Sequence, residues 1–501
     1  MAVNIQKKFA AIMDHPQLAF LRGVESLLPE AEWFLVGGAV RDIILGRVDK
    51  QHDFDFVVRG VGLDEVSAAL SQLGKVNYVG RDFGVLKFWR TDAVEGSKSV
   101  DIAWPRTELG TGTGGRRDFE VHADPDLPIA DDLGRRDFTI NAMAWSFRDQ
   151  VLIDPYDGLN DLSDKLLRAV GDAELRFLED HSRMLRCVRF ACELDFEIEE
   201  QTWEALLKQA RRINDLRERT DGRTERVVPY ETIAGEFLKA LSTNAVRAVD
   251  LFERGGIIFR LIPELARLQN LGQKSVWHTE GDVWTHTQLA LEKISGPSFA
   301  EFFPGERPSV ETLLAVLLHD IGKAETVTKT PHGVSFHGHD ARGAQLARGI
   351  VERLRLSSVP HLNVQSDRIE WLVRQHMFPI LVDLKHVRKT TLHKYFLQDE
   401  VLGRQLLHLS YADVSASLPE SGQPDLSNIK ELLKDLSGLK KVVAETGHHF
   451  SGKDVMQETG LESGPEVGRL LEVLREAQLS GEVMTDEQVK ELLRRTMDDG
   501  V

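Results

Sequence analysis

The chain of 501 residues has little cysteine and no stretch apolar enough to cross a membrane. Its two cysteines, Cys187 and Cys192, lie five residues apart in a predicted helix, which places them on different faces. Neither belongs to a metal-like cluster, so we expect two buried free thiols. No apolar run approaches the ~20 residues of a membrane span, and polar residues interrupt the N-terminal stretch where a signal peptide would be apolar. We therefore expect a cytoplasmic protein without a membrane partner.

The chain is also short of positive charge. It has 62 lysines and arginines against 79 aspartates and glutamates, a formal net charge of −17. Loose binding to nucleic acid depends on a surplus of basic residues, so this charge disfavours it. A shaped RNA responds to the local field instead, and residues 104–117 hold Arg106, Arg116 and Arg117 against Glu108 alone. The charge therefore favours selectivity for a shaped RNA over non-specific binding.

Internal repeats, low-complexity segments and a G-x-x-x-x-G-K-[ST] motif are absent from the sequence, so a P-loop ATPase is not supported. The length favours three or four packed units. Residues 31–146 alternate short β-rich runs with helical stretches, which predicts a mixed α/β unit, and periodic apolar positions predict helices from about residue 158. Glycine and proline breaks near 296–308 and 417–425 are typical of boundaries. These features together predict the α+β fold class.

A strand-like run, FLV, leads into Gly37 and Gly38 and then into a predicted helix that carries Arg41. Glycine lets backbone N–H groups approach a phosphate, and a helix N-terminus favours negative charge. Arg41 would lie in the first turn, within reach of triphosphate oxygens. An ordinary strand–helix turn has the same pattern, so this motif indicates a phosphate site only in combination with other motifs.

Two aspartates come next in the run HDFDFVV. Alternate residues of a strand share a face, so Asp53 and Asp55 point together while Phe54 and Phe56 point into the core. Adjacent carboxylates repel one another unless a cation neutralises them. Paired Mg²⁺ ions here would activate an attacking hydroxyl and hold a leaving pyrophosphate. A solvated strand edge is the alternative, and Asp101 in the run VDIAW is a candidate third carboxylate.

Charged residues precede an apolar helix start in RRDFTINA. Arg136 is suited to a phosphate. Asp137 and Asn141, four apart on one predicted helical face, are suited to ribose hydroxyls. A capped helix with a local salt bridge is the alternative.

The run EDHSRMLRCVRF places polar residues at helical spacing. Asp180, Arg183 and Arg186 are three residues apart and would share one helix face. Cytosine and adenine offer an exocyclic amine beside an unprotonated ring nitrogen, whereas uracil and guanine offer the reverse. An aspartate acceptor beside an arginine donor therefore matches C and A, and would select them without a nucleic-acid template. A surface salt bridge is the alternative.

In this order and spacing, GGAVRD, DFD, RRDFTINA and EDHSR resemble the class II tRNA nucleotidyltransferases of the polymerase β superfamily. The resemblance covers residues 31–270 and implies addition of C, C and A to the 3′ end of tRNA from CTP and ATP. It implies Asp53 and Asp55 as Mg²⁺ ligands. It assigns nucleotide binding to Gly38, Arg41 and Arg136, base selection to Asp180 and Arg183, and support of the triphosphate to Arg186 and Arg189. Gly37, Asp137 and Asn141 complete the candidate nucleotide site.

Bacterial poly(A) polymerases share these motifs. The run GRDFGV at residues 80–85 lacks the more basic pattern expected of them. Residues 106–131 are long enough for the flexible loop of full CCA-adding enzymes. Both features favour full CCA addition, with poly(A) synthesis and addition of only C or only A as the alternatives.

A separate cluster of histidines and aspartates lies in residues 278–413, where His319-Asp320 ends a strongly apolar predicted helix. Burying both without a metal or partner would be costly, and imidazole with carboxylate suits a transition metal or Mg²⁺. The set resembles the HD phosphohydrolase domain, which some bacterial tRNA nucleotidyltransferases carry. A third hypothesis is a phosphohydrolase whose N-terminal half only binds RNA. The resemblance implies that a second divalent metal, of unspecified identity, is bound by His286, His319, Asp320 and Asp413.

By the same resemblance, His339 and His376 serve a further ion or the substrate phosphate, and the implied reaction is hydrolysis of phosphomonoesters or 2′,3′-cyclic phosphates. Periodic Leu470, Leu471 and Leu474 predict packing of a C-terminal helix, which the family uses to hold the tRNA elbow. The expected segments are a nucleotidyltransferase head over 1–150, a helical neck and body over 151–270, an HD domain over 271–420 and a helical tail over 421–501.

Overall fold

The structure is a computed structural model that separates into two compact units. Unit 1 is Met1–Thr243 with Asp250–Leu261, and unit 2 is Asn244–Val249 with Ile262–Val501. Gly80–Phe83 of the GRDFGV run, and Arg116 and Arg117, lie outside the described residues. The structure describes residues 2–48, 53–79, 84–90, 99–110, 113–115, 119–219, 221–273, 279–330, 333–420, 422–445, 451–483 and 485–498.

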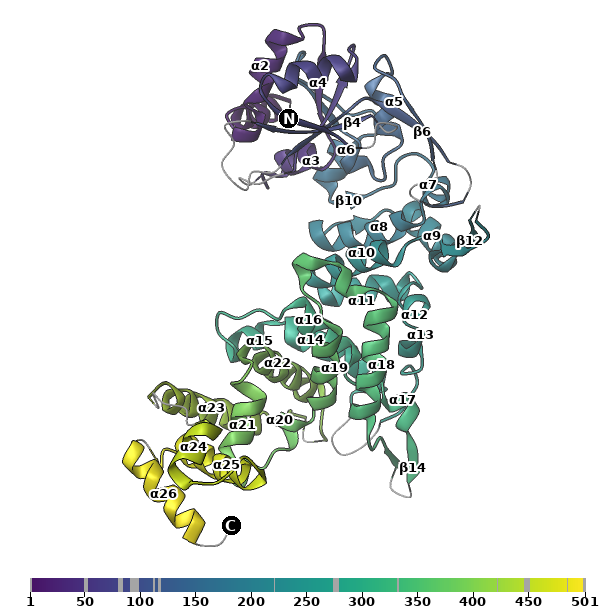
Figure 1. The fold of residues 1–501 in the computed structure, drawn as a ribbon. Helices are drawn as coiled ribbons and strands as arrows, with labels where there is room; N and C mark the ends of the chain where they lie inside the picture. The colour runs from purple at the N-terminus through teal and green to yellow at the C-terminus, as the bar shows by residue number, and fades with distance from the viewer. Residues whose placement is uncertain are drawn as a thin grey trace. The chain divides into compact units, whose positions relative to one another are not determined.

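Unit 1 is built on a seven-stranded sheet with the strand order β3-β4-β5-β2-β1-β8-β9. Figure 1 labels β4 in this sheet. Within this sheet, the β2–β5 pair is parallel and the other five pairs are antiparallel. The alternation of strands and helices predicted for residues 31–146 is confirmed, but β3, β8 and the strand Arg106–Gly110 within that range, and β9 beyond it, were not expected. The strands are β1 (Glu32–Val36), β2 (Asp55–Arg59), β3 (Gly74–Tyr78), β4 (Val85–Arg90), β5 (Val100–Ala103), β8 (Ala144–Ser146) and β9 (Val151–Ile153).

The two faces of this sheet carry different packing. On one face, Phe20 of α2 (Phe20–Leu27) packs edge-on against Trp33 and Phe56. On the other face, Phe34 and Val57 join a buried cluster with α5 (Ile129–Gly134). Because side chains alternate along β2, the positions of Asp53 and Asp55 fall on the α5 face. Two further helices of the sheet region are α3 (Gly38–Leu45) and α4 (Leu63–Ser71), and β6 (Arg106–Gly110) pairs with β7 (Phe119–Ala123) in a separate hairpin.

The helical part of unit 1 centres on α8 (Ser182–Leu194), which is buried along most of its length and packs against α10 (Tyr230–Thr243). Cys187 and Cys192 are buried free thiols on α8, as predicted, and burial raises the pKa of Cys187. The remaining helices of this part include α6 (Gly158–Asp164), α7 (Ala173–Glu179) and α9 (Glu200–Gln209).

Unit 2 is almost wholly helical. Its centre brings α14, α16, α19 and α22 together, and α18 packs along α19. The C-terminal helices α24–α26 share a small core that includes Leu470 and Leu474, with Leu471 packed at its edge, so the packing predicted there is confirmed. No helix in the described ranges is both long and apolar enough to cross a bilayer. The principal helices are α14 (Val283–Ser295), α16 (Val310–Leu318), α18 (His339–Arg353), α19 (Ser366–Gln375), α22 (Glu400–Ala416), α23 (Ser427–Glu445), α24 (Gly452–Thr459), α25 (Pro465–Ser480) and α26 (Asp486–Asp498).

Candidate functional site

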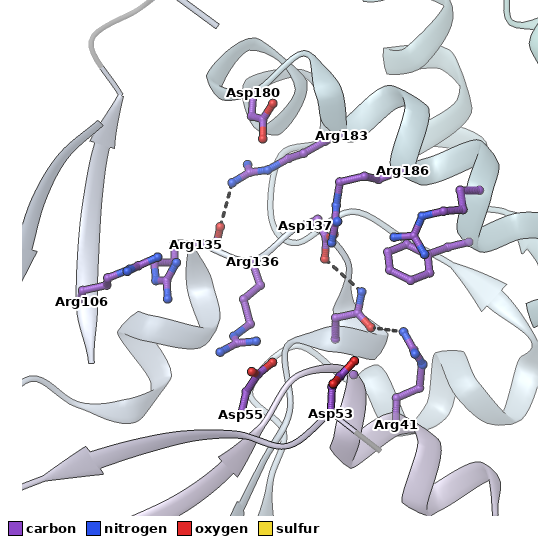
Figure 2. Close-up of a pocket in the computed structure, with 14 residues that line it drawn as sticks. Arg41, Asp53, Asp55, Arg106, Arg135, Arg136, Asp137, Asp180, Arg183 and Arg186 are labelled. Carbon is purple, nitrogen blue, oxygen red and sulfur yellow. Dashed lines mark hydrogen bonds and ion pairs between the residues drawn. The ribbon is translucent and has the colours of Figure 1, made fainter. Parts of the chain in front are cut away.

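A cavity of about 680 Å³ lies within unit 1 and gathers most of the residues singled out from the sequence (Figure 2). Seven arginines and four aspartates line it, so the local charge is positive although the chain is strongly acidic. Such a field favours an anionic ligand. The lining residues are Gly38, Arg41, Asp53, Asp55, Arg106, Arg135, Arg136, Asp137, Asn141, Asp180, Arg183, Arg186, Arg189 and Phe190.

The glycine turn forms one wall of the cavity. Gly37 has a φ of +73° and directly precedes α3, and a Cβ added there would lie 2.6 Å from Nη1 of Arg136. The backbone conformation therefore requires glycine, and a larger residue would also displace the tip of the Arg136 side chain. Arg41, in the first turn as predicted, donates from Nη1 to Oδ1 of Asn141 at 2.6 Å and from Nε and Nη2 to the Asp42 carboxylate. These bonds fix its guanidinium at the cavity.

The paired aspartates open onto the cavity, while Phe54 and Phe56 are each 1% exposed, as the alternation predicted. Loss of solvation by the surrounding protein raises the pKa of Asp55 to about 6, and the carboxylates of Asp101 and Asp53 add to this effect while Arg136 opposes it. Asp55 therefore stays protonated to a higher pH than an isolated aspartate does. Oxygen donors with this charge surplus fit a divalent metal.

Asp101 occupies a different position from the other two acids. It is the register partner of Asp55 across the parallel β2–β5 ladder, but it does not line the cavity. Its Oδ1 lies 3.2 Å from Nζ of Lys87. The geometry makes Asp101 an electrostatic neighbour of Asp55.

Two of the arginines are held by an acid that was not predicted from the sequence. Asp132 on α5 is fully buried and accepts from Nε and Nη2 of Arg135 at 3.0 and 2.8 Å, and from Nη2 of Arg136 at 3.2 Å. Burial alone would raise the pKa of Asp132, but the two guanidiniums lower it. The i,i+3 and i,i+4 spacing of this acid before two arginines was the available signal.

Asp137 and Asn141 lie close together, but not on an α-helix as predicted. Asp137 precedes the short 3₁₀ helix Thr139–Asn141, and its Oδ1 accepts from Phe138 N and from Nδ2 of Asn141. Such local side-chain to backbone bonds compete with helix formation. The Asp137 carboxylate also accepts from Nε and Nη2 of Arg186 at 2.8 and 2.5 Å, so it holds this arginine in the cavity.

The prediction that Asp180 shares a helix face with Arg183 and Arg186 is wrong. Asp180 follows α7 with an extended backbone (φ −144°), and its Oδ1 accepts from Ser182 N at 2.9 Å and from Ser182 Oγ at 2.6 Å. These bonds at the start of α8 stabilise a break between the two helices. Asp180 and Arg183 nevertheless line the same cavity, where Arg183 donates to Oε2 of Glu179 and to the carbonyl of Arg135 (Figure 2).

The connection between β6 and β7 touches the residue next to Asp180. The carbonyl of Gly114 accepts from His181 N at 3.0 Å. Gly114 has a φ of +76°, and a Cβ added there would overlap Nε2 and Cε1 of His181. The His181 ring is buried, and its Nδ1 lies 2.8 Å from the carbonyl of Phe177. A flexible loop was expected here from the sequence, but this contact was not.

Unit 2 contains a second cluster, in which the four predicted metal ligands come together. Nε2 of His286 lies 3.0 Å from Oδ1 of Asp413 and 4.0 Å from Oδ2 of Asp320. Nε2 of His319 lies 3.3 Å from Oδ2 of Asp320 and 3.7 Å from Oδ1 of Asp413. Ligand atoms from α14, from the end of α16 and from α22 therefore surround one point.

Two more histidines extend this cluster through the other oxygen of Asp320. Nε2 of His339 lies 3.5 Å from Oδ1 of Asp320 and 3.2 Å from Nε2 of His376. The result is two groups of potential ligands that share one carboxylate, His286 with His319 and His339 with His376.

The electrostatics of this cluster call for a cation. Burial opposes protonation of His319, yet the Asp320 and Asp413 carboxylates raise its pKa to about 10. Burial lowers the pKa of His376 to about 4. Although Nζ of Lys323 lies 2.7 Å from Oδ2 of Asp320, neither that oxygen nor Nε2 of His319 has a hydrogen bond of regular geometry in the part of the chain described. A buried donor set of this kind fits a metal ion.

Two supporting residues of this cluster were not found from the sequence. Oε1 of Glu280 lies 2.9 Å from Nδ1 of His286 and orients the ring, as second-layer carboxylates do at metal-binding histidines. Lys323 also donates to Oε1 of Gln273 at 3.0 Å. Its position in the run HDIGK was the signal available for it.

Family models match the two regions of the chain that hold these sites. A family model described as the poly A polymerase head domain matches residues 33–168, and an HD domain model matches residues 285–414. A multifunctional CCA protein from Alkalilimnicola ehrlichii is 37% identical over 326 residues, which cover 64% of this chain and 69% of that protein. An A-adding tRNA nucleotidyltransferase from Deinococcus radiodurans is 32% identical over 469 residues, 92% of this chain and 94% of that protein.

The fold is also similar to solved structures. The CCA-adding enzyme of Thermotoga maritima complexed with tRNA gives a TM-score of 0.62 at 20% sequence identity, covering 98% of both chains. This similarity shows that nearly the whole chain has the fold of that enzyme. Membership of a family rests on the sequence relatives described above. The chain belongs to the family of tRNA nucleotidyltransferases that contains the multifunctional CCA proteins and the A-adding enzymes.

Proposed function

We propose that unit 1 adds C, C and A to the 3′ end of tRNA, with CTP and ATP as substrates. The observation that carries this proposal is that a pair of residues suited to cations and a pair suited to a base line the same cavity. Asp53 and Asp55 supply oxygen ligands for divalent cations, which we take to be Mg²⁺, and Asp180 and Arg183 supply a hydrogen-bonding pair for a base. Seven arginines line the same cavity and suit a triphosphate.

The reaction joins the 3′ oxygen of the tRNA to the α-phosphorus of the nucleotide and breaks the bond from that phosphorus to the bridging oxygen of pyrophosphate. The hydroxyl proton is lost to solvent, and pyrophosphate leaves. Divalent cations bound at Asp53 and Asp55 would lower the pKa of the attacking hydroxyl and neutralise the leaving group. The arginines hold the triphosphate so that the α-phosphorus faces the RNA end, and Asp132 and Asp137 keep three of them in place.

Base choice falls to Asp180 and Arg183. Hydrogen bonds to Ser182 and to Glu179 orient the two side chains before any nucleotide arrives. An acceptor and a donor fixed in this way accept the pairing edges of C and A and leave unpaired groups against U and G. An unpaired buried polar group costs about 1–3 kcal/mol, which is enough for roughly tenfold to hundredfold discrimination.

Addition of A alone is the second candidate function, because the A-adding relative matches over 92% of this chain and the multifunctional CCA protein over 64%. One assay separates these functions and poly(A) synthesis. The purified protein is offered tRNA transcripts that end before CCA, after C or after CC, with CTP, with ATP or with both, and the product ends are sequenced. We expect CCA on every transcript. Extension of only the CC-ended transcript would assign A addition, and long A tails would assign poly(A) synthesis.

We also propose that unit 2 is a metal-dependent phosphohydrolase acting on phosphomonoesters or 2′,3′-cyclic phosphates. The two ligand groups joined by Asp320 support this proposal, since a divalent ion there would polarise a phosphate. The test offers bis-(p-nitrophenyl) phosphate, p-nitrophenyl phosphate and 2′,3′-cyclic AMP with Mg²⁺, Mn²⁺, Ni²⁺ or Co²⁺ in turn. Turnover that His319→Ala removes supports the proposal, and the absence of turnover with all four metals contradicts it.

A further inference from the structure

Three guanidinium groups of the unit 1 cavity lie around a single aromatic ring. The Cζ atoms of Arg41, Arg186 and Arg189 are 5.3, 5.2 and 3.9 Å from the centre of the Phe190 ring. All four side chains line the cavity, and Phe190 is only 5% exposed. Arg41 comes from α3 and the other residues from α8, so the ring joins two elements that are far apart in the sequence.

Each of the three guanidiniums is also held by an acid. Arg41 pairs with Asp42 at 2.9 Å, and Arg186 pairs with Asp137 at 2.5 Å. Arg189 pairs with Glu236 of α10 at 2.5 Å and with Glu193 at 2.6 Å. The acids compensate much of the repulsion among the three cations, and the ring contributes the negative face of its π system. The arginines are therefore ordered before any ligand binds.

Ordering in advance matters because a flexible arginine loses side-chain entropy when it binds an anion. A triphosphate carries several negative charges along a short chain and needs several cations at fixed spacing. We propose that Phe190 is a positioning residue that holds Arg41, Arg186 and Arg189 as a preformed site for the triphosphate of the incoming nucleotide. This inference rests on the proposed function of unit 1 and assigns it a residue outside the predicted site.

The triphosphate is common to CTP and ATP, so the ring acts on both nucleotides equally. Asp180 and Arg183 do not contact the three guanidiniums through any hydrogen bond seen in the described structure. A change in the ring should therefore weaken nucleotide binding without altering the choice of base. A packing defect would instead lower the amount of folded protein or the turnover rate.

The test replaces Phe190 by 4-fluoro-, 3,5-difluoro- and 3,4,5-trifluorophenylalanine, which keep the shape of the ring but remove its negative face stepwise. Binding of CTP, ATP and inorganic triphosphate is measured by calorimetry with Ca²⁺ and without tRNA. The same series at Phe138, which is fully buried and packs edge-on to Phe190 at 5.8 Å, is the control for fluorine itself. We expect affinity for all three ligands to fall in steps to about a tenth at position 190 and to stay within about twofold at position 138.

Steady-state kinetics on a tRNA transcript add a second readout. The KM for CTP and for ATP should rise by the same factor as the affinity falls, with kcat within about twofold. A flat series at position 190, equal effects at positions 138 and 190, or different factors for CTP and ATP would overturn the inference. If the wild-type protein binds nucleotides but never extends tRNA, the proposed function is wrong. The inference about Phe190 is still tested in that case, because the binding series does not depend on tRNA extension.

Discussion

Replacing Gly114 by alanine should loosen base selection without touching a residue that contacts nucleotide. Gly114 contacts His181 through the hydrogen bond from His181 N, and the His181 imidazole occupies the space that a Cβ at position 114 would need. An added Cβ would come far inside the 3.0 Å that separates real Cβ atoms from their neighbours. Because the ring is buried and tied to the Phe177 carbonyl, it has little freedom to retreat. The substitution should displace His181 and, with it, the adjoining Asp180.

The substitution should lower the free energy of unfolding for two reasons, and a matched variant at another glycine separates them. A non-glycine residue in the left-handed region costs about 1–2 kcal/mol, and overpacking a filled site costs a further 1–3 kcal/mol or so. Gly222 also has a φ of +76°, but a Cβ there would have nothing within 4 Å. Gly222→Ala therefore carries only the backbone cost. We expect Gly114→Ala to lower the thermal midpoint of unfolding by several degrees more than Gly222→Ala does.

The functional assay measures kcat/KM for each of the four nucleotides on a tRNA transcript that ends before CCA. Gly114→Ala should raise the use of UTP and GTP relative to CTP and ATP about tenfold, which corresponds to about 1.4 kcal/mol of lost discrimination. Gly222→Ala should leave the ratio unchanged. The double variant Gly114→Ala with His181→Ala removes the overlap, so it should recover much of the discrimination. Equal ratios in the two glycine variants, or a double variant no better than Gly114→Ala, would refute the reasoning.

Three further predictions concern the metal sites. Asp53→Ala should reduce nucleotide addition by at least about a thousandfold, because the carboxylate binds cations that the reaction needs. The tRNA affinity in a gel-shift assay should stay within about twofold of wild type. A parallel loss of tRNA affinity would contradict this role. Since the pKa of Asp55 is raised to about 6, protons compete with the metal for this carboxylate below pH 6. The Mg²⁺ concentration for half-maximal addition should therefore rise about tenfold for each pH unit below 6 and be constant above it. A concentration that stays the same from pH 5 to 8 would count against Asp55 as a ligand. His319→Ala should leave addition intact and reduce the rise in thermal midpoint that Mn²⁺ or Ni²⁺ gives the wild-type protein to the part that the Asp53 and Asp55 site supplies. A variant that responds to these metals as fully as the wild type would exclude His319 as a ligand.

The parts of the site that the sequence predicted depend on local geometry. Asp53 and Asp55 were placed correctly because the two-residue period of a strand fixes which side chains share a face, and the buried Phe54 and Phe56 report the opposite face. His319 and Asp320 were recognised as a pair because a charged dipeptide closing an apolar helix needs a partner. These inferences require no knowledge of distant contacts.

The errors and omissions arise where a short-range bond overrides periodicity or where a partner comes from another element. Hydrogen bonds from Ser182 end the helical spacing at Asp180, and those from Phe138 and Asn141 keep Asp137 out of a helix. Glu236 reaches Arg189 across 47 positions of sequence, which no spacing rule anticipates. Most of what positions the arginines is therefore tertiary.

Arg183, Arg186 and Arg189 all project from one buried helix, α8. A helix of this kind moves as a rigid unit, so any shift that redirects Arg183, which we propose selects the base, also redirects Arg186 and Arg189, which we propose bind the triphosphate. Base choice and nucleotide affinity are therefore difficult to change independently by moving this helix. Variants that displace α8 as a whole against α10, unlike changes to one of its side chains, should therefore alter base choice and nucleotide affinity together, and relatives with a different base preference should differ in how α8 packs.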